Sequence, residues 1–123
     1  MIDFHKMLYE AENAPNAEVL EDAPALAGWW IARGRNHLHA RGSVSGHPTI
    51  FDPFVTTSPV IGFNIDEGWM RTRSRYYRLG KPMDLGAFKI VEALDLDQAQ
   101  TELAEMRRLL KEELAIASSG QCN

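Results

Sequence analysis

The sequence lacks the features that mark secreted and membrane-spanning proteins. Its 123 residues include a single cysteine, Cys122, so no disulfide can form within the chain, and cysteine-poor chains are typical of reducing compartments. The stretch MIDFHKMLYEAEN lacks the apolar segment of a signal peptide. No run approaches the roughly 20 apolar residues that cross a bilayer. We therefore expect a soluble, cytoplasmic protein with no membrane partner.

Signatures of catalysis are also lacking. Ser58 and Ser74 do not lie in a Gly-x-Ser-x-Gly segment, and no glycine-rich segment ends in the Lys-Ser/Thr of a phosphate loop. A pair of His47 and Ser74 would lack an acidic residue to orient the imidazole. The sequence therefore leans against an enzyme and indicates no catalytic residue and no cofactor. A small hydrolase or metal enzyme around His47 is the third hypothesis for function.

A metal site has weak support. His37 and His39 lie two positions apart and would share one face of a strand, as in some metal sites. Further ligands would have to come from His47 or Asp52, and the flanking arginines would repel a cation. The sequence therefore predicts no metal.

The residues that are present indicate a globular protein with uneven charge. Hydrophobic residues make up 45% of the chain and charged residues 24%, which are ordinary values for one folded domain. Residues 1–32 hold one lysine and six acidic residues, 33–81 hold eight basic and three acidic residues, and 82–123 hold four basic and eight acidic residues. The pattern favours acidic helices beside a basic sheet, or a basic surface that binds a partner.

The basic middle of the chain has the alternation of an antiparallel sheet. We expect a hairpin from Trp29, with a strand over 37–46, and further strands over 54–63 and 69–79, because apolar and β-branched residues alternate between turn-forming segments. Pro59 would place its strand at an edge or a bulge. With a helix over 3–12, the prediction is an α+β fold, a small antiparallel β-meander or open half-barrel of about three to five strands.

The segment after the sheet ends in a long amphipathic helix. We expect one domain over 1–123, with a helical lead-in (1–28), a β-sheet core (29–81), a connector that could be strand or helix (82–94) and a C-terminal helix (95–118). An apolar stripe runs along this helix at heptad-like spacing. It can cover the sheet, pair with a second copy in a homodimer, or do both in different halves. The expected self-association residues are Leu103, Met106 and Leu110.

The stretch WMRTRSRYYRLG, residues 69–80, concentrates arginines and aromatics. On one regular strand its arginines would share a face with aromatic rings, the combination that phosphate contact and base stacking require. The alternatives are a surface that binds a protein partner, a surface covered by the acidic helices, and a solvated sheet face. The candidate binding residues are Trp69, Arg71, Arg73, Arg75, Tyr77 and Arg78.

About residues 22–81 contain a pattern of three short motifs, Gly-x-Val-x-Gly-His-Pro, then Thr-Ser, then Arg-Thr-x-Ser-x-x-Tyr-x-Leu-Gly. Its positions are Gly42, Val44, Gly46, His47, Pro48, Thr57, Ser58, Arg71, Thr72, Ser74, Tyr77, Leu79 and Gly80. In this pattern the chain resembles an uncharacterised family of short proteins from alphaproteobacteria and their phages or plasmids. Asp52-Pro53 departs from the Asp-Gly of relatives. The resemblance implies a small β-meander and a setting in mobile elements, and it implies no chemistry.

These observations favour a non-enzymatic protein-interaction module. By analogy with its implied setting, it would be a mobile-element accessory or a factor that modulates host defence. The second hypothesis is a nucleic-acid-binding protein that uses the basic aromatic strand. We expect His47, Thr57, Ser58, Thr72 and Ser74 to form a structural polar network, since buried hydroxyls and imidazoles usually satisfy one another.

Overall fold

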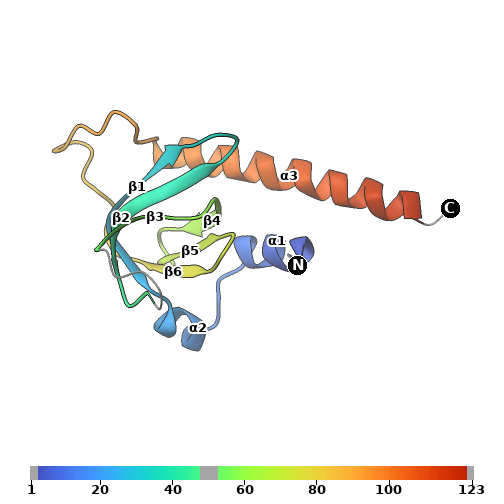
Figure 1. Ribbon diagram of the computed structural model, residues 1–123, viewed down its shortest axis with the longest axis horizontal. Coiled ribbons are helices and arrows are strands. Elements are labelled where there is room, and N and C mark those ends of the chain that lie inside the picture. Colours follow the sequence, from blue (N-terminus) through green and yellow to red (C-terminus); the bar gives the residue numbers. More distant parts are fainter. Residues whose placement is uncertain (1–2, 48–52, 122–123) are drawn as a thin grey trace.

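The computed structural model describes residues 3–47 and 53–121. Two short helices, α1 (Phe4–Glu12) and α2 (Ala17–Asp22), precede the strands, and a long helix, α3 (Leu96–Gln121), follows them (Figure 1). The strands are β1 (Ala25–Arg33), β2 (Leu38–Ser45), β3 (Phe54–Thr56), β4 (Val60–Asn64), β5 (Trp69–Thr72) and β6 (Tyr76–Leu79). The expected α+β class, the N-terminal helix and the C-terminal helix are confirmed.

All six strands belong to one mixed sheet in the order β3-β2-β1-β6-β5-β4. Strands β1 and β6 run parallel, and the other neighbours are antiparallel. The expectation of three to five antiparallel strands is therefore wrong. The parallel pair arises because the chain passes from β3 at one edge to β4 at the other and returns through β5 to β6, which lies beside the start of β1.

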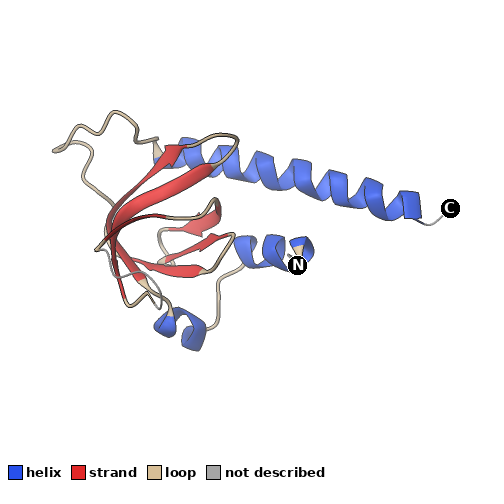
Figure 2. Ribbon diagram, viewed as in Figure 1, coloured by secondary structure: helices blue, strands red, loops and turns tan. Residues whose placement is uncertain are grey.

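The sheet curls, and its connectivity requires this. Strands β3 and β4 form opposite edges although only residues 57–59 separate them. A flat sheet of this size would hold its edges about 24 Å apart. The extended chain from Thr56 to Val60 reaches only about 14 Å. The edges must therefore approach each other, and Figure 2 shows the strands wrapped as an open, strongly bent layer.

The main core fills the concave side of this sheet. Its largest fully buried side chains come from three strands, β1, β4 and β5, and include Trp29, Ile31 and Met70. The first turns of α3 close the core with Ala99 and Leu103, which are 0% and 2% exposed. This part of α3 is thus a covering layer for the sheet, one of the two roles that the sequence left open.

Helix α3 also protects the free edge of β4. The side chain of Gln100 donates to the carbonyl of Phe63 at 2.7 Å, and Arg107 Nη1 donates to the carbonyl of Ile61 at 2.7 Å. An uncovered edge strand would offer these carbonyls to another chain. The helix begins where the sequence predicts, because Asp95 Oδ1 accepts from the backbone N–H of Asp97 and of Gln98.

Helix α1 packs between β4 and α3. The side chain of Asp3 caps it by accepting from Lys6 N, and Met7, Leu8 and Ala11 are buried. A glycine at position 62 permits the close approach, since a Cβ there would lie 2.2 Å from the carbonyl oxygen of Ala11. Met7 and Ala11 pack with Ile61, and Met106 and Leu110 of α3 join them in a second, smaller apolar cluster.

The boundary predicted between helical lead-in and sheet is wrong. Strand β1 begins at Ala25, four positions before the expected start at 29. Pro24 follows the end of α2, and its carbonyl accepts from Arg78 N, which continues the parallel pairing of Leu26 with Leu79. The register of β1 against β2 shifts between Ala27 and Trp30. This irregularity disturbs the alternation that would have marked the strand.

Two predicted strands are each divided. The segment 54–63 breaks at 57–59, where Pro59 cannot donate to a ladder and its carbonyl accepts from Arg73 N instead. The segment 69–79 breaks at 73–75, where the Thr72 hydroxyl bonds with the backbone of the turn. Local hydrogen bonds from a threonine thus replace strand pairing.

Candidate functional site

The arginine-rich stretch does not form the single basic face expected of it. Trp69 and Tyr77 are each only 3% exposed and lie in the core. Arg71 lies on β5, whereas Arg73 and Arg75 lie in the turn before β6. The alignment of arginines and aromatics on one strand, on which the nucleic-acid hypothesis depends, is therefore absent.

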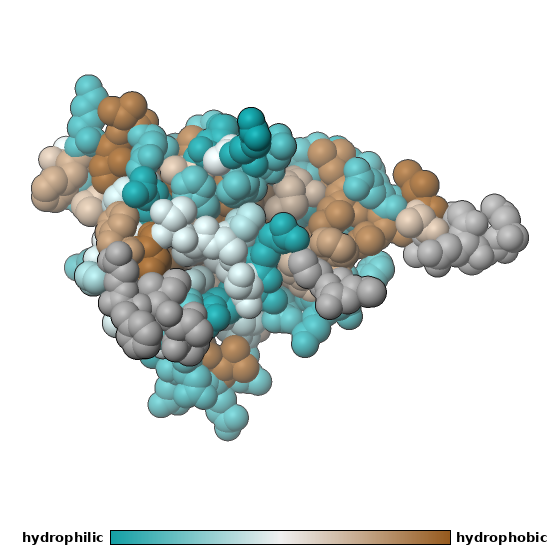
Figure 3. All heavy atoms as spheres, viewed as in Figure 1, coloured by the Kyte–Doolittle hydropathy of each residue, from teal (hydrophilic) through white to brown (hydrophobic). Residues whose placement is uncertain are grey.

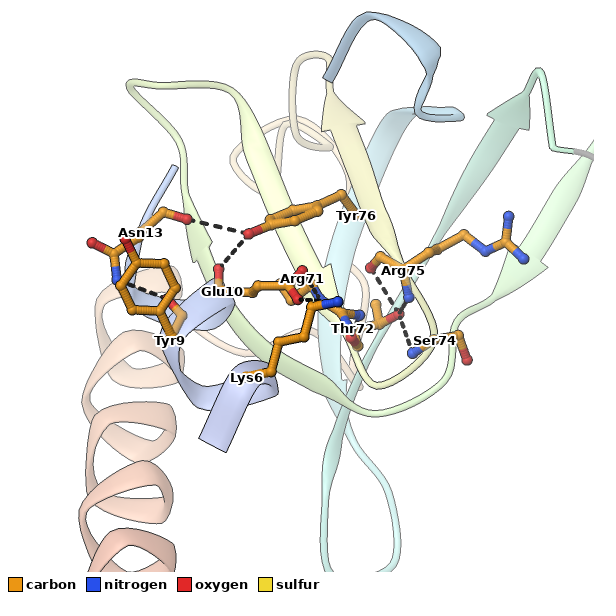
Figure 4. Close-up of polar contacts among 9 residues, drawn as sticks. All are labelled: Lys6, Tyr9, Glu10, Asn13, Arg71, Thr72, Ser74, Arg75 and Tyr76. Carbon is orange, nitrogen blue, oxygen red and sulfur yellow. Dashed lines mark hydrogen bonds and ion pairs between the residues drawn. The ribbon is translucent and has the colours of Figure 1, made fainter. Parts of the chain in front are cut away.

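Arg71 instead joins the sheet to α1 (Figure 4). It lies opposite Tyr76 in the β5–β6 pairing, and its guanidinium carbon sits 5.4 Å from the centre of the Tyr76 ring. Its Nε lies 3.4 Å from Glu10 Oε2. The Tyr76 hydroxyl donates to the carbonyls of Glu10 at 2.8 Å and Asn13 at 3.3 Å. The sheet thus holds the end of α1 by both charge and hydrogen bonds.

The contact between Tyr76 and α1 shifts the pKa of the Tyr76 hydroxyl well away from its ordinary value. Burial raises the pKa of Tyr76 from 10 to about 12, and the neighbouring Glu10 carboxylate acts in the same direction. Arg71 opposes this shift without cancelling it. The hydroxyl therefore stays a donor to the carbonyls of α1 throughout the neutral range.

A second arginine joins α1 to α3. Arg107 Nε lies 3.5 Å from Glu12 Oε2, and Lys111 Nζ lies 2.5 Å from Glu12 Oε1. The hydrogen bond from Lys111 lowers the pKa of Glu12, with help from the charge of Arg107 and against the effect of burial. Glu12 is therefore ionised at neutral pH and holds the two helices together.

Between these helices and the tip of the β1–β2 hairpin lies a groove of about 640 Å³. In Figure 1 the hairpin tip, α1 and the projecting part of α3 extend toward the same side of the sheet. The groove has an apolar lining from α1, β4 and α3 and a polar rim from the hairpin and from the turn before β6. The apolar lining comprises Phe4, Met7, Leu38, Pro59, Val60, Ile61, Leu103, Met106 and Leu110.

The rim of the groove is basic. Arg33 is neutralised by Glu102, with a hydrogen bond from Nη2 to Oε2 at 2.9 Å that lowers the pKa of the carboxyl group. Arg35 and Arg73 also line the groove, and both side chains are exposed. Within the described ranges, neither has an acidic partner closer than 4.0 Å. Two positive charges therefore face whatever enters.

Sequence reasoning missed half of this site. It treated the hairpin turn after Arg33 as connecting material, although Asn36 adopts a positive φ of 62° that presents Arg35 and His37 at the rim. It placed Phe4 only in the apolar stripe of the helix over 3–12, whereas the side chain is 38% exposed beside the groove. The one available signal was the concentration of basic residues in that turn.

The expected polar network lies in separate places. The Thr57 hydroxyl accepts from Ala40 N at 3.0 Å and donates to the carbonyl of Ser58. Thr72 and Ser74 meet in the turn before β6. The His47 ring lies 6.2 Å from that of Tyr77, and burial lowers the pKa of His47, with Arg75 adding to the effect. The Thr57 and Thr72 hydroxyls thus bond with backbone groups near the ends of β3 and β5.

The rings of His37 and His39 lie 5.7 Å apart at the hairpin tip. Among the residues that the structure describes, no three histidine, cysteine or acidic side chains are placed to hold a metal ion. Asp52, one suggested ligand, falls outside the described residues. Burial lowers the pKa of His39, as do the nearby His37 and Arg41.

The expected self-association residues are largely used within the chain. Leu103 is 2% exposed in the main core, and Met106 and Leu110 pack against the second apolar cluster while lining the groove. On the exposed face of α3, Leu109 and Ile116 are 47% and 71% exposed. Any pairing of helices would therefore use the face that carries Leu109 and Ile116.

Together, the fold and the site define an α+β domain in which a curled mixed sheet, protected by a helix at one edge, carries an apolar groove with a basic rim. The chain belongs to a family described as "Family of unknown function (DUF6634)", whose model matches residues 3–109. This match extends beyond the 22–81 segment that carries the resemblance. Searches of curated proteins and of solved structures give no match. No helix in the described ranges is long and apolar enough to cross a membrane.

Proposed function

We propose that this chain is a protein-binding domain whose groove receives an apolar segment of a partner flanked by acidic residues. One observation carries the proposal: an apolar cleft of about 640 Å³ is bordered by two exposed arginines, Arg35 and Arg73, on a chain of net charge −4. In this proposal the domain acts by binding.

The lining supports an apolar occupant. Ile61 and Leu103 are almost fully buried, while Phe4 stands 38% exposed at the groove. Cavities of this size commonly hold small molecules or a few side chains of a peptide, and apolar walls supply most of the binding free energy. A groove formed by two helices and a hairpin suits a short segment better than a flat protein surface.

The rim supports acidic flanks on that segment. Arg33 already has Glu102 as its partner, whereas Arg35 and Arg73 have no acid within ion-pair distance in the described part of the chain. Charge complementarity of this kind selects partners and speeds encounter more than it adds affinity. The basic rim would thus exclude lysine-rich segments of equal hydrophobicity.

A protein partner is favoured over a nucleic acid. Binding to single strands needs exposed aromatic rings on which bases stack, but Trp69 and Tyr77 are buried. Arg71 is held by Glu10 and Tyr76 and cannot reach a phosphate without leaving them. The setting in mobile elements implied by the resemblance remains a prediction, and so does a role in modulating host defence.

The test is fluorescence anisotropy with two labelled peptides that share their apolar residues and differ in carrying either glutamates or lysines. We expect the acidic peptide to bind at least about tenfold more tightly than the lysine peptide, equivalent to about 1.4 kcal/mol. The double variant Arg35→Glu/Arg73→Glu should lose this preference. The matched control is Arg78→Glu/Lys81→Glu, with the same change in charge at exposed positions that do not line the groove.

Labelled single-stranded RNA and DNA complete the experiment. Equal binding of the two peptides, or an unchanged preference in the groove variant, contradicts the proposal. Nucleic-acid binding that falls steeply with salt and depends on Arg73, Arg75 and Arg78 also contradicts it and would establish the second hypothesis.

A further inference from the structure

The segment between β6 and α3 exposes apolar side chains. Within residues 84–92, here called the connector loop, Leu85 is 40%, Phe88 60% and Val91 94% exposed. The loop projects from the sheet in Figure 1, and Figure 3 shows its apolar atoms gathered at the upper left. Contiguous exposed apolar groups of this kind mark interaction sites.

The loop is ordered by its own hydrogen bonds. Asp84 Oδ1 accepts from Gly86 N at 2.9 Å and Ala87 N at 3.2 Å, and the Asp84 carbonyl accepts from Phe88 N. Both ends are fixed to β1, because Met83 N donates to the carbonyl of Trp29 and Leu94 N to that of Ile31, each at 2.8 Å. The exposed apolar side chains thus lie on a turn that its own hydrogen bonds hold in place.

The charge around the loop is acidic. Residues 82–97 contain four acidic residues and one lysine, Lys89. Glu92 already bonds with Arg41, but Asp84, Asp95 and Asp97 are exposed and have no basic partner within 4.0 Å in the described part of the chain. An apolar turn flanked by acids has the chemistry that the groove is proposed to bind.

We infer that the connector loop of one copy binds in the groove of a second copy. The inference rests on the proposed function and names this chain as its own partner. In Figure 1 the loop projects to one side of the sheet, while the hairpin tip and α1, which border the groove, extend to the other. A single copy therefore cannot fill its own groove with its own loop.

The contact is heterologous, which predicts chains rather than closed dimers. Each copy would offer one loop and one groove, so a pair leaves one of each unused and can add further copies. In the contact, Leu85 and Phe88 would enter the apolar lining beside Phe4, and Asp84 would face Arg35 and Arg73. A helix-paired homodimer, by contrast, would use equivalent surfaces and stop at two copies.

The test is sedimentation velocity on the full chain across a wide range of concentration. We expect the average mass of the wild type to rise continuously with concentration. A loop variant, Phe88→Ser/Val91→Ser, and a groove variant, Arg35→Glu/Arg73→Glu, should each remain monomeric. Mixed in equal amounts, they should form one-to-one dimers that grow no further, because only one intact loop and one intact groove meet.

The matched control is Leu109→Ser/Ile116→Ser, which removes exposed apolar groups from α3 and leaves loop and groove intact. It should assemble like the wild type. A monomeric control variant, a loop variant that still assembles, or a mixture that stays monomeric overturns the inference. A wild type that is monomeric at every concentration also overturns it, yet leaves the proposed function standing if the acidic peptide binds.

Discussion

Two pairs of arginines in this molecule have opposite surroundings. Arg71 and Arg107 are only 13% and 12% exposed, and each has a glutamate of α1 beside it. Arg35 and Arg73 are exposed at the groove without an acidic neighbour in the described part of the chain. The first pair fixes α1 to the sheet and to α3, whereas the second pair is available to bind an acidic partner.

Arg71 and Arg73 lie only two positions apart, so sequence position does not decide which role an arginine takes. Strand β5 ends at Thr72. The Thr72 hydroxyl donates to the carbonyl of Arg75 and so stabilises the turn that contains Arg73. What decides the role is whether α1 reaches the guanidinium. We therefore expect the largest loss of stability from a change at the contact of α1 with β4, smaller losses from removal of its polar contacts, and the smallest from removal of the exposed arginines.

The largest effect is expected from Gly62→Ala. The new Cβ would lie 2.2 Å from the carbonyl oxygen of Ala11, so α1 must shift or detach from β4. We expect a loss of about 3 kcal/mol in the free energy of unfolding, measured by urea denaturation. Detachment would also expose Arg71 and Arg107 and so remove the difference between the two pairs.

A suitable control is Gly86→Ala, where the Cβ would lie 3.2 Å from the side chain of Asp84 and meet no backbone. It should cost less than about 1 kcal/mol. Equal losses in the two variants would mean that the fit of α1 against β4 is not what makes Gly62 necessary.

The next effect is expected from Arg107→Ala. Its guanidinium donates to the Ile61 carbonyl at 2.7 Å and faces Glu12, so removal leaves a partly buried acceptor and a carboxylate with one partner fewer. We expect a loss of about 2 kcal/mol in the free energy of unfolding. Arg107→Lys should restore part of it. An unchanged urea midpoint would show that Arg107 is no more structural than Arg35.

Much of the fold follows from local signals in the sequence. The amphipathic spacing over 3–12 and the apolar stripe over 95–118 placed both terminal helices within three residues of their observed ends, and turn-forming segments gave the hairpin before 37–46. The parallel pairing of β1 with β6 was not predictable, because it joins Leu26 to Leu79, and the four strands β2 to β5 lie between them in the chain. Alternation reports which face of a strand is buried, but it does not report neighbours.

The site was predictable only in part. The basic stretch supplies Arg73 to the groove. The turn at Thr72 and the cover from α1 were not predictable, because they depend on contacts between distant segments, such as Tyr76 with Glu10. The groove is lined by residues of α1, the hairpin tip, β4 and α3. These segments lie far apart in the sequence, so no short motif predicts the groove. The exposure of Phe88 and Val91 was not predictable either, because apolar residues in a connector are usually buried in the core.

A smaller effect is expected from Tyr76→Phe. Loss of the hydroxyl removes its bonds to the carbonyls of Glu10 and Asn13 and should cost about 1 kcal/mol at neutral pH. The pH dependence has a definite sign. With a pKa raised from 10 to about 12, the folded state keeps the proton longer than the unfolded chain does.

The contribution of Tyr76 is therefore complete below pH 10 and is lost as the pH rises toward 12. Wild type should lose stability across this window more steeply than Tyr76→Phe, as measured by urea unfolding at several pH values. Tyr77→Phe is the companion variant, because burial also raises the pKa of Tyr77. Parallel curves for wild type and Tyr76→Phe would contradict the role given to this hydroxyl.

The smallest effect on stability is expected from Arg35→Ala and Arg73→Ala. Both side chains are exposed and have no acidic partner within 4.0 Å in the described ranges, so each change should alter the free energy of unfolding by less than about 0.5 kcal/mol. The same variants should weaken binding of the acidic peptide in the anisotropy assay. A stability loss as large as that of Arg107→Ala would show that these arginines also support the fold, and the contrast between the two pairs would then fail.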